Sequence, residues 1–228
     1  MNGVTTVLFD CLDSTQDYLR ARPDEKEVCV LAKRQESGKG TKGRSFSSET
    51  GGVYLSLRKT YDGLQAKDAF QVMAAAAVAV CKTLESYGVD PKIKWANDVF
   101  LHGKKICGIL IENRLSGGLL ESALIGVGLN VNNILPAELQ DTAITLAECI
   151  GETPVEEVAG RLLSYLYAPF DFADYEKRLG FVGEEVGLCF DGKTEKATFL
   201  GVDKRGNLRV RINGKETVFS SVEVRIRK

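Results

Sequence analysis

Hydrophobic residues fall along the chain in short runs, and most of these runs have the length and period of strands. Five of them alternate or continue over strand-like lengths: residues 4–9, 28–32, 53–57, 106–112 and 119–128. The last two are joined across Ser116-Gly117-Gly118, so we expect them to pair with each other. Residues 92–99 predict a further short strand that runs into a polar corner. The pattern predicts a sheet at the centre of the fold.

Other segments have helical signals. Residues 15–21 predict a short helix that ends before Pro23, and residues 66–87 predict a long helix closed by Gly88. The long helix is apolar nearly all round between Val72 and Cys81, so we expect it to be buried against the sheet. Residues 143–149 predict a third helix. The sequence Thr153-Pro154-Val155-Glu156 predicts a capping box that starts a fourth helix, running to about residue 175.

The last part of the chain has a different hydrophobic pattern. Beyond Gly180, short alternating strands are separated by strong turn signals: Asp191-Gly192, Lys204-Arg205-Gly206-Asn207 and Asn213-Gly214. They predict a small β-barrel of about four or five strands. The barrel leans basic, but its alternating apolar residues are more simply a core than a surface for stacking on nucleic-acid bases. We therefore expect two domains, residues 1–180 and residues 181–228.

Composition narrows the class of protein. The chain has 228 residues, of which 44% are hydrophobic and 27% charged, as in a globular protein with a real core. A formal net charge of -1 gives no general reason to expect nucleic acid or a membrane surface as partner. No basic and apolar leader opens the chain, and six scattered cysteines without a C-x-x-C motif indicate free thiols in a reducing compartment. We expect a soluble, cytoplasmic protein.

The clearest chemical signal is the segment from Gln35 to Phe46. It places three glycines among three cations directly after a predicted strand, so backbone N–H groups and cationic side chains can surround an anion. The glycines also spell the dinucleotide fingerprint and nearly spell a P-loop, but both motifs must open a helix, whereas residues 53–57 predict a strand. A purely structural glycine turn is the remaining alternative. We favour an anion-binding loop between two strands.

Other polar positions have two interpretations each. Asp13-Ser14-Thr15-Gln16 suits a helix cap and equally a ligand contact at a helix N-terminus. Asn97-Asp98 suits a turn, or a site that orients a nucleotide and holds Mg²⁺ through oxygen. Lys105 is either a charge at the rim or a fixed cation in a pocket. Gly108 leaves side-chain space within a strand, and Asn130 offers an amide near a glycine turn.

Together these residues resemble one family, the bacterial biotin–protein ligases, over essentially the whole chain. Four blocks match in order: Asp13-Ser14-Thr15-Gln16, Gly38 to Arg44, Lys94-Trp95-Ala96-Asn97-Asp98, and Lys105-Ile106-Cys107-Gly108-Ile109-Leu110-Ile111-Glu112. A trailing Gly126-Val127-Gly128-Leu129-Asn130 and the terminal barrel also fit. One block would be weak, but the ordered set is specific.

The resemblance implies an α+β fold, a mixed β-sheet catalytic domain flanked by helices and followed by an SH3-like barrel. It implies that biotin and MgATP form biotinyl-5′-AMP, from which biotin passes to a lysine of a carrier domain. By the same resemblance, Lys105 and Arg44 are catalytic and Asp98 binds the metal. The biotin-binding residues would be Ser14, Thr15, Gln35, Gly38, Lys39 and Gly108. The ATP- and adenylate-binding residues would be Gly40, Thr41, Lys42, Arg44, Phe46, Trp95, Asn97, Asp98 and Asn130.

The chain departs from the family pattern at three positions. Lys39 and Thr41 replace the first two arginines of the glycine-rich loop, and Ala96 replaces a proline. Lysine keeps a charge but loses the bidentate fork, and threonine loses both. We therefore expect weaker retention of the reactive adenylate.

Partners and alternatives follow from the same comparison with the family. The expected acceptor is the biotin carboxyl carrier domain of acetyl-CoA carboxylase or a related carboxylase. The first strand begins within a few residues of Met1, where repressor members carry a DNA-binding domain, so we expect no DNA partner. Exposed sheet edges suggest a homodimer. Three alternatives stay open: a lipoate or octanoate ligase or transferase of the same fold, a biotin-binding protein without turnover, and a nucleic-acid module built on the barrel.

Overall fold

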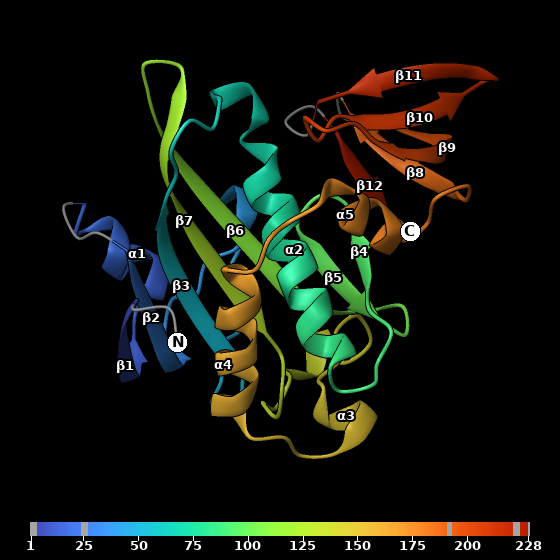
Figure 1. The fold of residues 1–228 in the computed structure, drawn as a ribbon. Helices are drawn as coiled ribbons and strands as arrows, with labels where there is room; N and C mark the ends of the chain where they lie inside the picture. The colour runs from blue at the N-terminus through green and yellow to red at the C-terminus, as the bar shows by residue number, and fades with distance from the viewer. Residues whose placement is uncertain (1–3, 24–26, 191–192, 221–223, 228) are drawn as a thin grey trace.

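The computed structural model describes residues 4–23, 27–190, 193–220 and 224–227 (Figure 1). Its centre is a seven-stranded sheet with the strand order β1-β2-β3-β7-β6-β5-β4. The strands are β1 (Thr5–Leu12), β2 (Val28–Gln35), β3 (Val53–Thr60), β4 (Lys92–Lys94), β5 (Asp98–Leu101), β6 (Lys104–Ser116) and β7 (Leu119–Leu129). Because β1 and β2 are parallel while the other neighbours are antiparallel, the predicted mixed sheet is confirmed.

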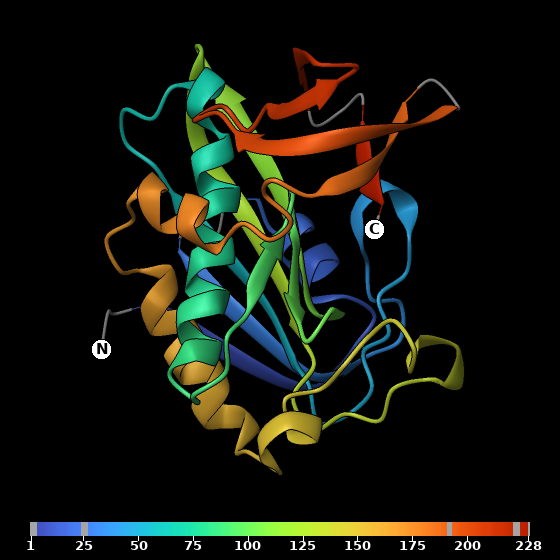
Figure 2. The ribbon, with the colours of Figure 1, turned by 90° about the vertical axis from the view of Figure 1, so that its right-hand side faces the viewer.

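Helices cover the two faces of this sheet unequally. The long helix α2 (Phe70–Glu85) and α4 (Val155–Leu166) pack together over one face and enclose the main core, as the alanine-rich, wholly apolar middle of α2 predicts (Figures 1 and 2). The short helix α1 (Thr15–Arg20) packs through Leu19 against β2 on the other face, beside Leu124 of β7. The sheet thus leaves much of its α1 face open to a ligand.

Alternation along β7 separates these two faces. Ile125, Val127 and Leu129 belong to the main core, whereas Gly126 and Gly128 fall between them on the α1 face. The strand continues to Leu129, so Gly126 and Gly128 lie within it and not in the glycine turn that we predicted before Asn130. That prediction was wrong because the glycines are fully paired, Gly126 with Leu110 and Gly128 with Gly108 of β6.

Two helical predictions are also corrected. Only Ala147–Ile150 is helical (α3), because Ala143 forms a bridge with Lys105 and the N–H of Ile144 donates to the Lys105 carbonyl at 3.0 Å. The predicted fourth helix is split into α4 and α5 (Phe172–Arg178). Pro169 lies between them, and proline disfavours helical backbone before it and offers no N–H.

Helices α4 and α5 differ in how their N-termini are capped. The N-cap of α4 is Pro154, which makes no side-chain cap bond, and the Thr153 hydroxyl donates instead to the Gly151 carbonyl at 3.3 Å. The predicted capping box is therefore wrong. Helix α5 begins at Asp171, whose carboxylate accepts the Ala173 N–H at 3.0 Å. Pro169, which disfavours helix, and Asp171, which caps α5, are thus close together in the sequence.

The C-terminal part is a five-stranded antiparallel sheet with the order β11-β10-β9-β8-β12, consistent with the expected SH3-like fold. Its strands are β8 (Glu185–Phe190), β9 (Lys193–Val202), β10 (Leu208–Ile212), β11 (Lys215–Phe219) and β12 (Arg225–Arg227). The turns at residues 203–207 and 213–214 are where the sequence predicts them, while Asp191-Gly192 lies outside the described residues. Within the described ranges, no helix has the length and apolarity needed to cross a membrane.

Candidate active site

A cavity of about 100 Å³ opens on the α1 face of the seven-stranded sheet. The start of α1, the end of β2, the glycine-rich loop and the middle of β3, β6 and β7 line it. Of the residues that we predicted for the site, the cavity brings together Ser14, Thr15, Gln35, Lys39, Gly40, Thr41, Arg44, Phe46, Asn97, Lys105 and Gly108. Segments far apart in the sequence therefore meet at one place, as the ordered motif blocks require.

Glycines of β6 and β7 make the floor of the cavity. A Cβ atom at Gly128 would lie 2.5 Å from the ring of Phe46, and one at Gly126 would lie 2.6 Å from Oε1 of Gln16. A Cβ atom at Gly108 would lie 3.1 Å from Nζ of Lys105. Side chains already occupy the space above these strands, and the Phe46 ring leaves no room for a Cβ atom at Gly128.

One end of the cavity is polar and buried. The Thr15 N–H donates to Oε1 of Gln35 at 2.8 Å, and the hydroxyls of Thr15 and Ser56 are 2.8 Å apart. Ser56 also donates to Oε1 of Gln16 at 3.0 Å, and Gln35 donates to the Ser48 hydroxyl at 2.9 Å. Thr15, Gln16 and Ser56 are at most 4% exposed. We call Thr15, Gln16, Gln35 and Ser56 the polar end.

Ser14 is both a helix cap and a residue that lines the cavity. It is the N-cap of α1, with an extended backbone and a hydroxyl that accepts the Asp17 N–H at 3.3 Å. It also lines the cavity and is 3% exposed. A single serine thus fixes the start of the helix and turns that start towards the ligand space.

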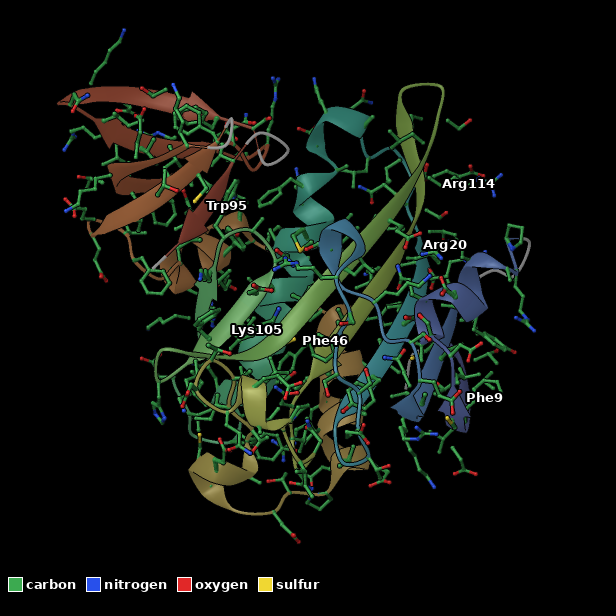
Figure 3. All side chains as sticks on the ribbon, turned by 180° about the vertical axis from the view of Figure 1, so that it is seen from behind. Phe9, Arg20, Phe46, Trp95, Lys105 and Arg114 are labelled. Atoms are coloured by element: carbon green, nitrogen blue, oxygen red, sulfur yellow. The ribbon has the colours of Figure 1, made fainter. Side chains whose placement is uncertain are left out.

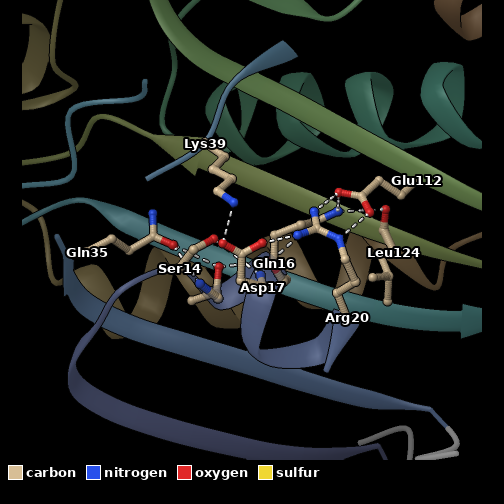
Figure 4. Close-up of polar contacts among 10 residues, drawn as sticks. Ser14, Gln16, Asp17, Arg20, Gln35, Lys39, Glu112 and Leu124 are labelled. Atoms are coloured by element: carbon tan, nitrogen blue, oxygen red, sulfur yellow. Dashed lines mark hydrogen bonds and ion pairs between the residues drawn. The ribbon is translucent and has the colours of Figure 1, made fainter. Parts of the chain in front are cut away.

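A charged cluster joins the glycine-rich loop to α1 and β6 (Figure 4). Lys39 Nζ lies 2.6 Å from Asp17 Oδ2, and Arg20 pairs with both Asp17 and Glu112. Gln16 Nε2 donates to Glu112 Oε1 at 3.3 Å, which connects the cluster to the polar end. We call the pair of Lys39 and Asp17 the loop clasp.

The same contacts shift the acidity of both carboxylates. Burial alone would raise the pKa of Asp17, but hydrogen bonding and charge from Lys39 and Arg20 outweigh it, so the pKa lies below its ordinary value. The hydrogen bond from Arg20 likewise lowers the pKa of Glu112. Both side chains are therefore charged at neutral pH.

The glycine-rich loop folds back on itself as a strand-loop-strand segment. Lys39 bridges to Ser45, the Gly40 N–H donates to the Arg44 carbonyl at 2.7 Å, and the Phe46 N–H donates to the Gly38 carbonyl at 2.8 Å. Residues Thr41–Gly43 form only a short 3-10 turn. Because no α-helix follows the glycines, neither the dinucleotide fingerprint nor the P-loop applies.

Lys105 lies next to Phe46 (Figure 3) and over Gly108, which pairs with Gly128, whereas Gln16 of the polar end lies over Gly126. Its Nζ is 2.7 Å from Oδ1 of Asp98 and 5.8 Å from the centre of the Phe46 ring. Asn97 donates through Nδ2 to the Ile109 carbonyl at 3.1 Å and accepts the Ile109 N–H on its own carbonyl at 2.9 Å. Lys105 is therefore a held cation in a pocket and not a free charge at a rim.

Other predicted residues do not line the cavity. Gly38 is buried behind it, and Asp98 contacts two residues that do line it, Lys105 at 2.7 Å and Asn97 at 3.4 Å. Asn130 is 5% exposed and donates to the Ile144 carbonyl at 3.2 Å, while Trp95 is 7% exposed and donates to the Gly206 carbonyl at 3.0 Å. The side chain of Lys42 lies outside the described part of the structure. Direct ligand contacts by these residues remain predictions.

Several lining residues were missing from our predicted set: Gln16, Ser45, Leu55, Ser56, Ile109, Leu110, Gly126, Val127 and Gly128. Gln16, Gly126 and Gly128 had a signal, because the first belongs to a polar block and the glycines interrupt an apolar strand. Ser56 had no clear signal. A single polar residue in an apolar strand is also expected where a strand alternates between a buried face and a solvent face.

The chain is similar in sequence to known proteins. Residues 8–130 match the Biotin/lipoate A/B protein ligase family. The chain is 35% identical over 216 residues to the biotin–[acetyl-CoA-carboxylase] ligase of Paracoccus denitrificans, covering 86% of this chain and 88% of that protein. It is also 35% identical over 158 residues to the bifunctional ligase/repressor BirA of Bacillus subtilis, where the match covers 66% of this chain. The chain spans about half of that relative, 48% of its length.

A solved structure gives the same relationship in three dimensions. The biotin protein ligase from Aquifex aeolicus, in complex with biotin and ATP, superposes with a TM-score of 0.83 at 26% sequence identity. The superposition covers 98% of this chain and 99% of that one. The agreement extends over both sheets.

Proposed function

The chain belongs to the biotin/lipoate A/B protein ligase family, and we propose that it is a biotin–protein ligase. In the first step it would join biotin to the AMP part of ATP and release pyrophosphate. In the second it would pass biotin to a lysine of a carrier domain from acetyl-CoA carboxylase or a related carboxylase. The observation that carries the choice of biotin is the polar end of the cavity.

The polar end favours a ureido ring over a dithiolane ring. Thr15 and Ser56 offer hydroxyls that both donate and accept, and Gln35 offers an amide with the same range. A ureido group has two N–H donors and a carbonyl acceptor, so it can exchange hydrogen bonds with this cluster. The dithiolane of lipoate and the alkyl chain of octanoate have no N–H or C=O at that end, and would cover buried polar groups without such bonds. The same family includes lipoate ligases, so this difference decides the substrate class.

The first step needs stabilisation of charge more than a protein nucleophile. A biotin carboxylate oxygen bonds to the α-phosphorus, and the bond from that phosphorus to the bridging oxygen of pyrophosphate breaks. Lys105, held by Asp98 at 2.7 Å, supplies a fixed ammonium at the cavity. Arg44 lines the same cavity from the loop and supplies a second cation.

The residues around Asp98 suit a magnesium ion bound with ATP. Mg²⁺ commonly takes one or two carboxylates together with phosphate oxygens, and Asp98 and the side-chain oxygen of Asn97 are hard oxygen donors at one corner. Among the described residues no group of three or more His, Cys, Asp or Glu side chains could hold a metal by itself. When bound, the ion neutralises phosphate charge.

In the second step the amine of the acceptor lysine attacks the carbonyl carbon of the mixed anhydride. The carbon–nitrogen bond forms, AMP leaves with the electrons of the carbon–oxygen bond, and the amine loses a proton. Lys105 can stabilise the oxygen charge that develops at the same carbonyl. Its role is electrostatic, because its described neighbours include a carboxylate that keeps it paired and no base that would make it a nucleophile.

Location and assembly belong to the same proposal. We place the enzyme in the cytoplasm, since all six cysteines are free, as in proteins of a reducing compartment. We propose a homodimer because β1 lies at an edge of the seven-stranded sheet and carries Leu8 at 58% exposure. Sedimentation at several protein concentrations would test the dimer.

Pyrophosphate release tests the function directly. MgATP is supplied with biotin, lipoate or octanoate in parallel, and each product is then offered to a biotin carrier domain and to a lipoyl domain. Biotin-dependent release followed by label on the carrier lysine is the expected result. Release with lipoate or octanoate alone would assign the chain to the lipoate branch, and tight biotin binding without release would make it a binding protein.

A further inference from the structure

The C-terminal sheet contacts the catalytic corner through one buried hydrogen bond. Trp95 lies in the corner between β4 and β5, and its indole N–H donates to the Gly206 carbonyl at 3.0 Å. Gly206 belongs to the turn of residues 203–207, which joins β9 to β10. Figure 3 shows Trp95 beside the C-terminal sheet and away from Phe46 and Lys105. Trp95 is thus not a wall of the cavity but a link behind it.

The turn that offers this carbonyl is held rigidly by its own residues. Oδ1 of Asp203 accepts the N–H groups of Arg205 at 2.8 Å and Asn207 at 3.0 Å. The Gly206 N–H donates to the Asp203 carbonyl at 2.9 Å, and Gly206 has a φ of +82°, which favours glycine. We call residues 203–207 the docking turn. Its geometry fixes the direction of the Gly206 carbonyl.

The docking turn also packs closely on the first sheet's helices. A Cβ atom at Gly206 would overlap the ring of Phe70, the first residue of α2. The Phe70 ring lies 5.6 Å from the ring of Tyr175, and the Tyr175 hydroxyl donates to the Ala96 carbonyl at 3.5 Å. The corner therefore has two hydrogen-bonded contacts with later parts of the chain: Gly206 accepts from Trp95, and Tyr175 donates to Ala96.

The other side of the corner carries the polar groups of the proposed adenylation site. Asn97 lines the cavity and exchanges hydrogen bonds with the backbone of Ile109. Asp98 holds Lys105 at 2.7 Å. Only one residue, Ala96, separates Trp95 from Asn97 in the chain. The backbone therefore connects Trp95 closely to Asn97 and Asp98, and the ion pair connects Asp98 to Lys105.

We propose that the docking turn is a positioning element of the ATP side of the site, and that Trp95 and Gly206 are its positioning residues. This inference rests on the proposed function for its kinetic consequence. It predicts that disturbing the turn impairs ATP use while biotin binding at the polar end is unchanged, because Thr15, Gln35 and Ser56 belong to other elements. A misplacement of about 1 Å at a reacting group can cost as much as about 100-fold in rate.

Two glycine substitutions provide a matched comparison. Gly206→Ala introduces a Cβ that overlaps Phe70, whereas Gly214→Ala introduces one with nothing within 4 Å. The two glycines have similar φ angles, +82° and +79°, and both lie in turns of the C-terminal sheet. Both variants therefore suffer the backbone strain of alanine at positive φ, and only Gly206→Ala disturbs the docking turn.

The first readout is independent of activity. Trp95 is the only tryptophan of the chain, so its fluorescence reports on this contact alone. We expect the emission of Gly206→Ala to shift to the red as water reaches the indole, and that of Gly214→Ala to match the parent protein. Thermal unfolding of both variants verifies that they fold. An unshifted emission in folded Gly206→Ala would overturn the docking.

The second readout separates ATP from biotin. For Gly206→Ala we expect KM for ATP to rise and the adenylation rate to fall, each by about tenfold, with the dissociation constant for biotin unchanged. Equal losses for ATP and biotin, or a shifted emission with unchanged ATP kinetics, would overturn the positioning role.

Trp95→Phe tests the hydrogen bond without the overlap that Gly206→Ala creates, because it keeps an aromatic ring and removes the N–H donor together with part of the indole volume. We expect a loss of a few fold in the same ATP parameters, the usual scale of one hydrogen bond. Unchanged kinetics in Trp95→Phe would remove that bond from the proposal. If the parent protein released no pyrophosphate at all, the proposed function would fail and the kinetic role with it, while the fluorescence shift would still decide whether the turn docks.

Discussion

The two ends of the cavity differ in how the protein holds them. At the polar end, Thr15, Gln16 and Ser56 are at most 4% exposed, and Ser56 of β3 hydrogen-bonds to both residues of α1. On the glycine-rich loop, the Lys39 side chain is 47% exposed and Arg44 is exposed, and their contacts are ion pairs and bonds within the loop. Buried hydrogen bonds resist salt, whereas exposed charges are screened. The polar end is thus held by buried hydrogen bonds and the loop by exposed charges, so we expect salt to act mainly on the loop.

The largest expected effect comes from Lys105. Lys105→Ala removes the cation that we propose to stabilise charge during adenylation, so we expect the adenylation rate to fall by about 10²–10³. Rapid-quench measurement of biotinyl-AMP formation checks this. Lys104→Ala is the matched control, because the neighbouring Lys104 donates to the Gln140 carbonyl at 2.7 Å and does not line the cavity. A stable covalent biotinyl-Lys105 intermediate would contradict the electrostatic role.

The second effect tests the polar end itself. Ser56→Ala leaves a buried oxygen of Gln16 without its donor, and unpaired buried groups cost about 1–3 kcal/mol. We expect biotin to bind about 10- to 100-fold more weakly by titration calorimetry, equally at low and high salt. Ser164→Ala, which removes an exposed hydroxyl on α4, should leave binding unchanged. A strong salt dependence of biotin binding in Ser56→Ala would contradict the difference that we infer between the two ends of the cavity.

The contrast also explains which features the sequence could predict. The loop was recognisable because glycines and cations gather within twelve residues, and the central strands because their apolar runs are long and β-branched. Lys105 was recognisable as a charge at the mouth of such a run. These are local patterns, and their physical cause lies in neighbouring residues.

Features set by distant contacts were out of reach. Ser56 has its role because Thr15 and Gln16 pack over it, 41 and 40 residues away. Trp95 is turned away from the cavity by Gly206, 111 residues further along. Ala143 and Ile144 are not helical because they bridge and hydrogen-bond to Lys105, contacts that overrule local helix propensity. In each case a residue far away in the sequence decides the outcome, and a single sequence does not show which distant residues meet.

A smaller effect is expected at the loop end from Thr41→Arg. A guanidinium at this position adds a charge-assisted contact to the adenylate, worth about 1 kcal/mol on an exposed loop. We expect biotinyl-AMP to leave about fivefold more slowly in a filter-binding chase, with the difference reduced at high salt. Thr50→Arg adds the same charge to an exposed position outside the cavity lining and should not change the rate. An unchanged off-rate in Thr41→Arg would remove adenylate retention from the functions of this position.

The smallest effect is expected from the loop clasp. Asp17→Asn removes the partner that holds Lys39 to α1 at 2.6 Å, so the loop should open more often and release biotin faster. Both side chains are partly exposed, and such pairs contribute at most about 1 kcal/mol, so the dissociation rate should rise no more than about fivefold. Stopped-flow release with excess unlabelled biotin measures it.

Salt, pH and a second ion pair decide whether the clasp acts as a charge. The difference between Asp17→Asn and the parent protein should disappear at about 1 M salt, where the screening length is near 3 Å. Because the pKa of Asp17 is lowered, the clasp persists through neutral pH and is lost only in acid, as the pH falls through that lowered pKa and the carboxylate is protonated. Asp10→Asn breaks a similar 2.8 Å pair with Lys33 on the edge strand and should not alter release. A salt-independent change in Asp17→Asn would instead assign Asp17 a structural part in α1, and would place it with the buried polar end.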